Sequence, residues 1–237
     1  PELPTTEIHR FSTTGAEPAD YVASGSVTGT LLDQWSMSEH ADHLRVAVTI
    51  EEPWTGRTND SEPASSSSVV VLRTEGDQLL ETGRADDLGK GEQIYAVRFM
   101  GDQGYVVTFR QVDPLYSLDL SNPAAPTATG ELKITGFSSY LHPVGDGLLL
   151  GVGQEATEEG RVTGGQVSLF DVSDPASPQR VAQLPLGENA SSEVEYDHRA
   201  FLFWGDLALV PYSSWAFDEE TGEQFRSGLI GIDVAPT

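Results

Sequence analysis

Three observations in the sequence predict an all-β fold built of repeated four-stranded antiparallel sheets. First, residues 92–136 contain four short apolar runs, and Gly-Asp, Asp-Pro and Asn-Pro turn signals separate them. Second, the same plan recurs in the residues that follow. Third, the turns return at matching positions along the chain. Four antiparallel strands in about 45 residues are typical of a β-propeller blade. The predicted fold is therefore a β-propeller with about four blades present.

The turns give the clearest evidence of repetition. The turn between the first and second strands reads Gly101-Asp102, then Gly145-Asp146, then Gly205-Asp206, with Ala41-Asp42 in the earliest copy. The third strand ends at the equivalent aspartates Asp119, Asp171 and Asp233, which gives spacings of 171 − 119 = 52 and 233 − 171 = 62. These spacings exceed a typical blade, and we expect the excess in loops over residues 154–165 and 215–226.

Taken in order, the elements predict one partial propeller domain over residues 1–237. Strands over 5–11 and 21–27 resemble the outer pair of a blade. Blades are predicted over roughly 34–87, 92–135 and 138–187, with a split blade drawn from 196–235, from 5–28, or from both. The Ser- and Pro-rich segment 51–67 predicts a surface loop, and we expect His40 and His43 to be exposed with it. The whole pattern suggests part of a larger propeller.

Composition removes several classes of function. The formal net charge is −24, from 37 acidic and 13 basic residues, so the surface repels phosphate backbones and we expect no nucleic-acid partner. No apolar run reaches the roughly 18 residues of a membrane span, so none is predicted in this chain. The chain has no cysteine, which excludes disulfides and thiolate metal sites.

Polar residues on the inner strands are the candidate binding residues, because inner strands line the central channel of a propeller. Carboxylates and a histidine around one funnel could carry out acid–base chemistry or hold a cation, or could simply line a water-filled channel. No nucleophile elbow, P-loop, dinucleotide fingerprint or H-E-x-x-H motif is present, so no catalytic or cofactor-binding residue is predicted. The channel-lining candidates are Glu39, Glu92, Arg98, His142, Glu195, Asp197 and His198.

Two patterns in the sequence are compatible with a bound metal ion. Asp171, Ser173 and Asp174 could present oxygens to calcium, although the segment lacks the central Gly and distal Glu of a helix-loop-helix calcium site. The alternative is a turn in which Asp and Asn bond their own backbone between two prolines. The five histidines, among them His9, could bind zinc only if they converge across blades. No cofactor is predicted, and calcium is the ion kept as an alternative.

The sequence also resembles a known family. The segment GEQIYAVRFMGDQGYVVTFRQVDPLYSLDLSNPAAPTATGELKITGFSSYLHP, from Gly91, is similar to bacterial and archaeal secreted proteins with a C-terminal β-propeller distantly related to WD repeats. Further matches are GTLLDQWSMSEHADHLRVAVT, SLFDVSDPASP and YDHRAFLFW. The resemblance covers nearly the whole chain as an internal portion of that propeller. It implies export to the extracellular space or cell surface and implies no established reaction.

Two hypotheses about function follow. The first is a non-catalytic extracellular scaffold that binds a protein or a glycan, with self-association through exposed terminal blades. The second is a metal-dependent hydrolase or lactonase-type enzyme with its site at the channel.

Overall fold

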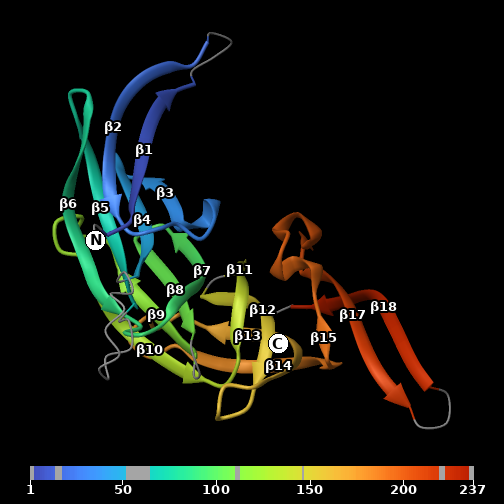
Figure 1. Ribbon diagram of the computed structural model, residues 1–237. Helices are drawn as coiled ribbons and strands as arrows, with labels where there is room; N and C mark the ends of the chain where they lie inside the picture. The colour runs from blue at the N-terminus through green and yellow to red at the C-terminus, as the bar shows by residue number, and fades with distance from the viewer. Residues whose placement is uncertain are drawn as a thin grey trace. The chain divides into compact units, whose positions relative to one another are not determined.

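The computed structural model confirms an all-β fold with several four-stranded antiparallel sheets, and its first sheet has six strands (Figure 1). It describes residues 3–13, 18–51, 65–109, 113–145, 147–218 and 222–234. Within these ranges every regular element is a strand, apart from three 3₁₀ turns of three residues each, η1 (Gln34–Ser36), η2 (Glu193–Glu195) and η3 (His198–Ala200).

The strands group by sheet. The first sheet holds β1 (Thr5–Ser12), β2 (Asp20–Thr28), β3 (Met37–His40), β4 (His43–Glu51), β5 (Ser65–Glu75) and β6 (Gln78–Leu88). The second holds β7 (Gln93–Met100), β8 (Gln103–Phe109), β9 (Asp113–Asp119) and β10 (Thr127–Ile134). The third holds β11 (Phe137–Gly145), β12 (Leu148–Ala156), β13 (Val162–Asp171) and β14 (Gln179–Glu188). The last holds β15 (Ala190–Ser191), β16 (Leu202–Trp204), β17 (Leu207–Asp218) and β18 (Gly222–Asp233).

Strand order follows the blade plan. The orders are β1-β2-β6-β5-β4-β3, β10-β9-β8-β7, β11-β12-β13-β14 and β15-β17-β16, with β18 paired to β17. By contact the chain divides into two compact units, residues 1–108 with 118–129 and residues 109–117 with 130–237. Each unit is described by itself below. The predicted single domain and the size of the complete propeller stay predictions.

In the first unit the hairpin β1–β2 folds back over the sheet that β3–β6 form. One parallel bridge, Ser24 to Gln78, joins β2 to β6. Gly25 permits this close approach, because a Cβ there would lie 2.4 Å from the Leu79 carbonyl oxygen. Ile8 of the hairpin belongs to a buried cluster that also contains Ala23, Val27, Val46, Val48, Val70, Leu72 and Leu79. The N-terminal strand pair is thus held by apolar packing more than by backbone hydrogen bonds.

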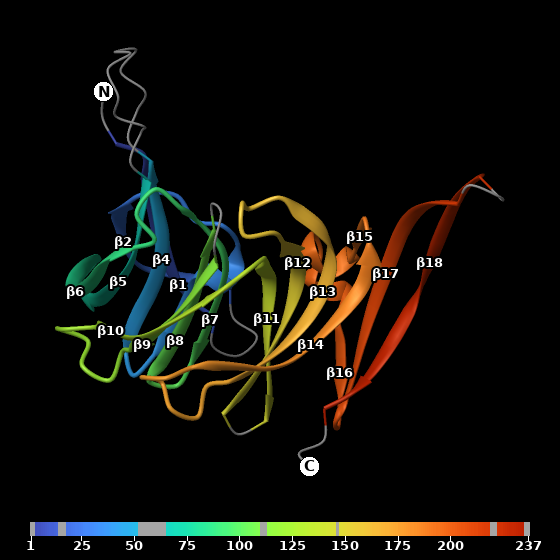
Figure 2. The ribbon, with the colours of Figure 1, turned by 90° about the horizontal axis from the view of Figure 1, so that it is seen from below.

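The predicted alternation of apolar side chains accounts for the cores of the blades. Alternate residues of a strand point to opposite faces, and in β5 the run Val69–Leu72 is buried without a break, so both faces of that strand are covered. Val97, Val107, Leu118 and Leu120 are also buried, whereas Phe99 and Phe109 are half-buried. Figure 2 shows the resulting twisted sheets, with β11 to β14 side by side.

The Pro-rich turns after the third strands fit against glycines of the preceding sheet. A Cβ on Gly83 of β6 would lie 2.6 Å from the carbonyl oxygen of Pro123, and one on Gly130 of β10 would lie 2.2 Å from that of Pro175. The contact of Gly83 lies within the first unit, and the contact of Gly130 lies within the second unit. The repeated turn therefore packs directly on a fourth strand that has no side chain at the contact point.

Three loop predictions are wrong in part. Ser65–Ser68 belong to β5, with Ser67 and Ser68 buried, because they pair with Glu51–Val48 of β4. Residues 52–64 of the predicted 51–67 loop lie outside the described residues. The predicted 154–165 loop is shorter, since Gln154 pairs with Gly165 and Ala156 with Val162. The predicted 215–226 loop instead continues β17 and β18, which pair from Leu207–Asp233 to Asp218–Gly222.

Candidate functional site

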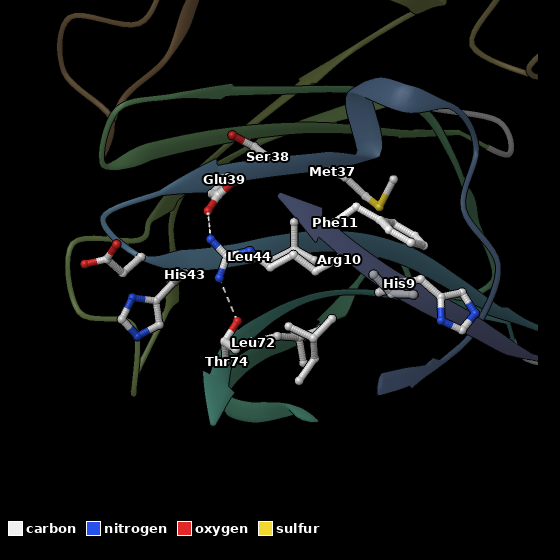
Figure 3. A pocket seen from close by; sticks show the side chains of 13 residues that line it. His9, Arg10, Phe11, Met37, Ser38, Glu39, His43, Leu44, Leu72 and Thr74 are labelled. Atoms are coloured by element: carbon white, nitrogen blue, oxygen red, sulfur yellow. Dashed lines mark hydrogen bonds and ion pairs between the residues drawn. The ribbon is translucent and has the colours of Figure 1, made fainter. Parts of the chain in front are cut away.

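A groove on the first unit contains one of the predicted site residues, Glu39. It has a volume of about 310 Å³ and is bounded by β1 on one side and by β3 and β4 on the other (Figure 3). Ile8, Leu44, Leu72 and Leu79 give it an apolar floor that is continuous with the buried cluster. The remaining lining residues are His9, Arg10, Phe11, Met37, Ser38, Glu39, Asp42, His43 and Thr74.

One arginine crosses this groove. The Arg10 guanidinium donates to Glu39 Oε1 at 2.6 Å and to Thr74 Oγ1 at 2.8 Å, so it links three strands (Figure 3). The carboxylate and guanidinium are both partly exposed, so solvent screens the pair. Sequence reasoning did not single out Arg10 or Thr74, because their partners lie 29 and 64 residues away. The groove thus combines an apolar floor with an ion pair between Arg10 and Glu39, whose charges cancel.

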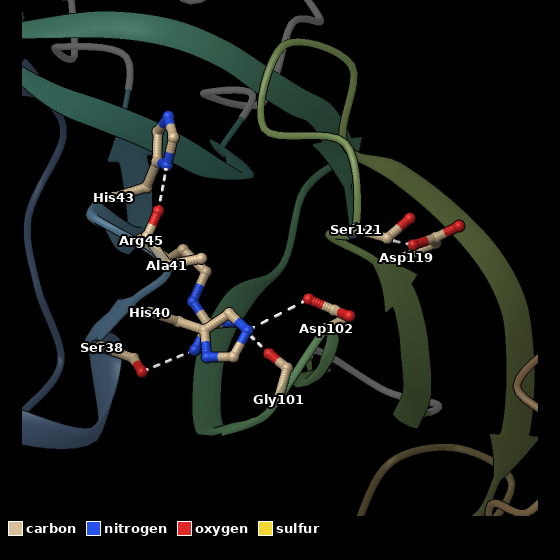
Figure 4. Close-up of polar contacts among 9 residues, drawn as sticks. All are labelled: Ser38, His40, Ala41, His43, Arg45, Gly101, Asp102, Asp119 and Ser121. Atoms are coloured by element: carbon tan, nitrogen blue, oxygen red, sulfur yellow. Dashed lines mark hydrogen bonds and ion pairs between the residues drawn. The ribbon is translucent and has the colours of Figure 1, made fainter.

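The histidine-containing turn beside the groove is held by local contacts (Figure 4). His40 Nε2 lies 3.1 Å from Asp102 Oδ1, and His43 Nδ1 lies 2.8 Å from the Ala41 carbonyl oxygen. Arg45 donates to the Gly101 carbonyl oxygen and to Ser38 Oγ. The Gly101-Asp102 turn is therefore tied to the Ala41-Asp42 turn. The expectation that both histidines are exposed is only partly correct, because each is half-buried.

Glu92 and Arg98, the other candidates of this unit, make structural contacts. Glu92 directly precedes β7 and accepts a hydrogen bond of 2.5 Å from Thr108 Oγ1. Arg98 is buried within β7, and its guanidinium carbon lies 3.8 Å from the centroid of the Trp35 ring. Such a cation–π contact stabilises a desolvated guanidinium. Both residues support the packing between β7, β8 and η1.

In the second unit His142 sits in an aromatic cluster on β11. Its Nδ1 lies 3.0 Å from the Tyr140 hydroxyl oxygen, and its ring centroid lies 4.8 Å from Phe201 and 5.4 Å from Phe203. The cluster places the imidazole between aromatic rings with one nitrogen bonded to a phenol. The sequence placed His142 correctly on a first strand but gave no sign of the ring contacts.

Glu195 is held by neutral hydrogen-bond donors in the second unit. Its carboxylate accepts hydrogen bonds from the Ser192 backbone N–H at 2.7 Å and from Gln154 Nε2 at 2.6 and 2.7 Å. Burial raises the pKa of Glu195, and the bonds from Ser192 and Gln154 offset part of that increase. The partners are neutral, so the desolvation of the charge prevails. Gln154 was not predicted as a site residue.

Asp197 and His198 follow Glu195, and the predicted place of all three residues on a strand is wrong. Glu195 ends η2, which Ser192 opens with a capping box, and Asp197 caps η3, which begins at His198. These caps satisfy the backbone in turns, so β16 begins only at Leu202. Asp197 accepts bonds from the Arg199 side chain and backbone, and these lower the pKa of Asp197. The S-x-x-E spacing of Ser192 and Glu195 was the signal available in the sequence.

The candidate residues therefore fall into two sets, Glu39, Glu92 and Arg98 in the first unit and His142, Glu195, Asp197 and His198 in the second. Their common position around one channel stays a prediction. The second unit also has a cavity of about 520 Å³, lined mainly by apolar residues of β12, β13 and β14 and by Ile232–Val234.

The described residues contain no group of three or more His, Asp or Glu side chains placed to hold a metal ion. The aspartates of the repeated segment bond their own turns. Asp119 Oδ1 accepts from the Ser121 backbone N–H at 2.9 Å, and Asp171 Oδ1 accepts from the Ser173 backbone N–H at 3.0 Å (Figure 4 shows the first). Bonds from Ser121 and Ser173 lower the pKa of Asp119 and of Asp171. The described geometry is that of the predicted turn.

None of the described helices is long and apolar enough to cross a membrane. The chain matches the family described as Beta propeller domain over residues 2–236, and it belongs to that family.

Similar proteins come from archaea. An uncharacterized protein of Methanocaldococcus jannaschii, MJ1554, is 40% identical over 182 residues, which is 77% of this chain and 27% of that protein. An uncharacterized protein of Archaeoglobus fulgidus is 43% identical over 202 residues, 85% of this chain and 28% of that protein. The chain thus spans less than a third of the length of these relatives.

A solved structure also shows the fold. The periplasmic gluconolactonase PpgL of Pseudomonas aeruginosa is similar with a TM-score of 0.54 at 13% identity, over 99% of this chain and 69% of that one. At this level of identity the likeness supports the propeller fold alone.

Proposed function

We propose that this β-propeller segment is a binding scaffold, and that the groove of the first unit accepts an extended segment of a partner protein. The observation that carries this proposal is the apolar groove between β1 and β3, crossed by Arg10, Glu39 and Thr74. Clefts of about 300–1,000 Å³ that combine an apolar surface with placed polar groups are a usual form of binding site.

The strand edges favour a polypeptide over a glycan. β1 and β3 are the two end strands of their sheet, and within the described chain β1 pairs with β2 and β3 with β4. A peptide strand can add its backbone hydrogen bonds to such an edge, while alternate side chains enter a neighbouring groove. The floor formed by Leu44, Leu72 and Leu79 would take apolar side chains of that peptide.

The hydrogen-bonded residues Arg10, Glu39 and Thr74 would set the orientation of the bound peptide rather than its affinity. Arg10 and Glu39 neutralise each other, so the groove itself adds no net charge from this pair. A partner with a polar residue next to an apolar one would meet both parts of the groove. Because exposed ion pairs contribute only about 0–1 kcal/mol, the apolar contacts would supply most of the binding energy.

Selection of peptides from a random display library on the immobilised chain tests this proposal. Met37 lines the groove and is partly exposed, so Met37→Asp should weaken the selected peptides by about tenfold or more. Leu80→Asp is the matched control, because Leu80 is a similarly exposed apolar residue on β6 outside this groove. Equal affinity for the parent chain and Met37→Asp would contradict the assignment.

A hydrolase is the second candidate, and the raised pKa of Glu195 is the observation that favours it. A protonated carboxyl can act as a general acid. The likeness to a gluconolactonase supports the fold but not the reaction. Hydrolysis of gluconolactone, measured with and without added calcium, tests this candidate. Activity that Glu195→Gln abolishes would favour the enzyme over the scaffold.

We also propose that the protein acts outside the cytoplasm, at the cell surface or beyond it. The strong negative charge suits a soluble extracellular surface, and the absence of cysteine makes folding independent of the redox state of the compartment. Fractionation of cells that express the complete natural protein tests this location. Recovery in the cytoplasmic fraction alone would contradict it.

A further inference from the structure

The turn that joins β14 to β15 contains an acceptor pattern for N-linked glycosylation. Asn189-Ala190-Ser191 is an asparagine followed by a residue other than proline and then by a serine, and in this pattern the asparagine amide takes the sugar. The chain has three asparagines. Asn122 does not fit the pattern because Pro123 follows it, and Asn59-Asp60-Ser61, which does fit, lies outside the described residues. Asn189 is therefore the acceptor whose surroundings the structure describes.

The folded turn leaves room for a glycan on Asn189. The residue is exposed and has a positive φ of 50°, a conformation that asparagine tolerates. Its backbone N–H donates to the Thr163 carbonyl oxygen at 3.1 Å, which fixes the turn. Its side-chain amide has no hydrogen-bond partner within the described part of the chain. A Cβ added at Gly187 would meet no described atom within 4 Å, so the space beside the turn is open.

We infer that Asn189 is an N-glycosylation site, an inference that rests on the proposed location outside the cytoplasm. The donor is an oligosaccharide linked through phosphate to a lipid, and a membrane-bound oligosaccharyltransferase catalyses the transfer. Asn189 Nδ2 forms a bond to the anomeric carbon of the first sugar, and the bond between that carbon and the phosphate oxygen breaks. The lipid phosphate leaves with the electron pair, and one amide proton passes to a base of the enzyme. Nothing is oxidised or reduced in this step.

The folded state also restricts when the transfer occurs. The pattern requires the serine hydroxyl, and Ser191 is half-buried with its Oγ 3.4 Å from Ser213 Oγ. Ala190 is buried, and it pairs with Ser214 of β17. The enzyme therefore reaches the triplet before β15 pairs with β17. Once the chain has folded, the glycan stays on the exposed side of the turn and adds a bulky polar group to that surface.

Mass spectrometry of the complete natural protein, isolated from its own host, tests the inference. Trypsin cleaves after Arg180 and Arg199, so Asn189 is the single asparagine of peptide 181–199, whereas Asn59 falls in peptide 58–73. Peptide 181–199 should carry the added mass of whole sugar residues, and its fragment ions should place that mass on Asn189.

Three variants at the triplet separate modification from a structural role. Asn189→Asp keeps a residue that tolerates a positive φ but removes the amide, and Ser191→Ala keeps the amide but removes the hydroxyl. Both should abolish the added mass on peptide 181–199, and Ser191→Thr should retain it. Asn59→Gln is the control, because it removes the other triplet and should leave the mass on peptide 181–199 unchanged. Unchanged melting temperatures of the unglycosylated chains confirm that the variants fold.

The outcomes distinguish this inference from the proposed location. An exported protein whose peptide 181–199 has only its unmodified mass would overturn the site and leave the location intact. A protein found only in the cytoplasm and unmodified would overturn both. Added mass on peptide 58–73 alone would overturn the assignment to Asn189. Added mass on peptide 181–199 that persists in Ser191→Ala would also overturn it, because the modification would then not depend on the acceptor pattern.

Discussion

The groove of the first unit and the Glu195 region of the second place a glutamate in opposite surroundings. Glu39 is partly exposed and pairs with the Arg10 guanidinium at 2.6 Å. Glu195 lies deeper and accepts only from neutral donors, the Ser192 backbone N–H and the Gln154 amide. The raised pKa of Glu195 reflects that difference. Residue type alone therefore does not determine the chemistry of a carboxylate, because burial and the charge of its partner determine it.

The sharpest test of this comparison removes each carboxylate. Glu195→Ala leaves the Gln154 amide and the buried Ser192 backbone N–H without their acceptor. A buried donor left unsatisfied costs about 1–3 kcal/mol, so the free energy of unfolding should fall by that amount. Denaturant unfolding of the parent chain and the variant measures it. A loss no larger than that of Glu39→Ala would remove the contrast between the two regions.

The pH dependence of stability tests whether burial is the main cause of the raised pKa of Glu195. Because the pKa of Glu195 is raised in the folded state, the folded chain binds this proton more tightly than the unfolded chain does. Its contribution to stability is therefore fully present below the ordinary glutamate pKa of about 4.3 and is lost as the pH rises through the raised pKa. The free energy of unfolding of the parent chain relative to Glu195→Gln should decrease across that window. A difference that stays flat, or rises, with pH would contradict burial as the dominant effect.

The smallest effect belongs to Glu39. Glu39→Gln removes one partner of an exposed ion pair, so stability should change by no more than about 1 kcal/mol, and added salt should reduce the change. Thermal unfolding at low and high salt measures both quantities. A larger, salt-independent loss would mean that the groove contributes to folding as the Glu195 region does.

Local signals in the sequence predicted the blades well. The Gly101-Asp102 turn and the turns after Asp119 and Asp171 depend on residues a few positions apart, so their geometry is encoded nearby. The family match over residues 2–236 agrees with that fold. Long-range partners were not predictable in this way. Arg10 contacts Glu39 and Thr74 because the hairpin folds against their strands. The spacing of these residues in the sequence predicts neither contact.

Two further differences arise from packing. The 215–226 loop is predicted from the excess of the repeat spacing over a typical blade, but the Trp215–Phe225 pair continues the hairpin into that stretch. The predicted strand through His198 ends in 3₁₀ turns, because Ser192 and Asp197 cap them. Strand pairing determines the structure in the first stretch, and local caps determine it in the second.

The contact between a fourth-strand glycine and a Pro-rich turn has an evolutionary consequence. Gly83 meets the turn at Pro123, and Gly130 meets the turn at Pro175. The second predicted blade, residues 92–135, thus contributes to both contacts. Its turn at Pro123 meets a glycine of the preceding segment, and its Gly130 meets the turn of the following segment. After a tandem duplication of such a segment, the glycine of one copy would meet the turn of the next copy in the same way. Arrays of this kind can therefore lengthen or shorten by whole segments, whereas a side chain at either glycine would obstruct the fit of every copy made from it.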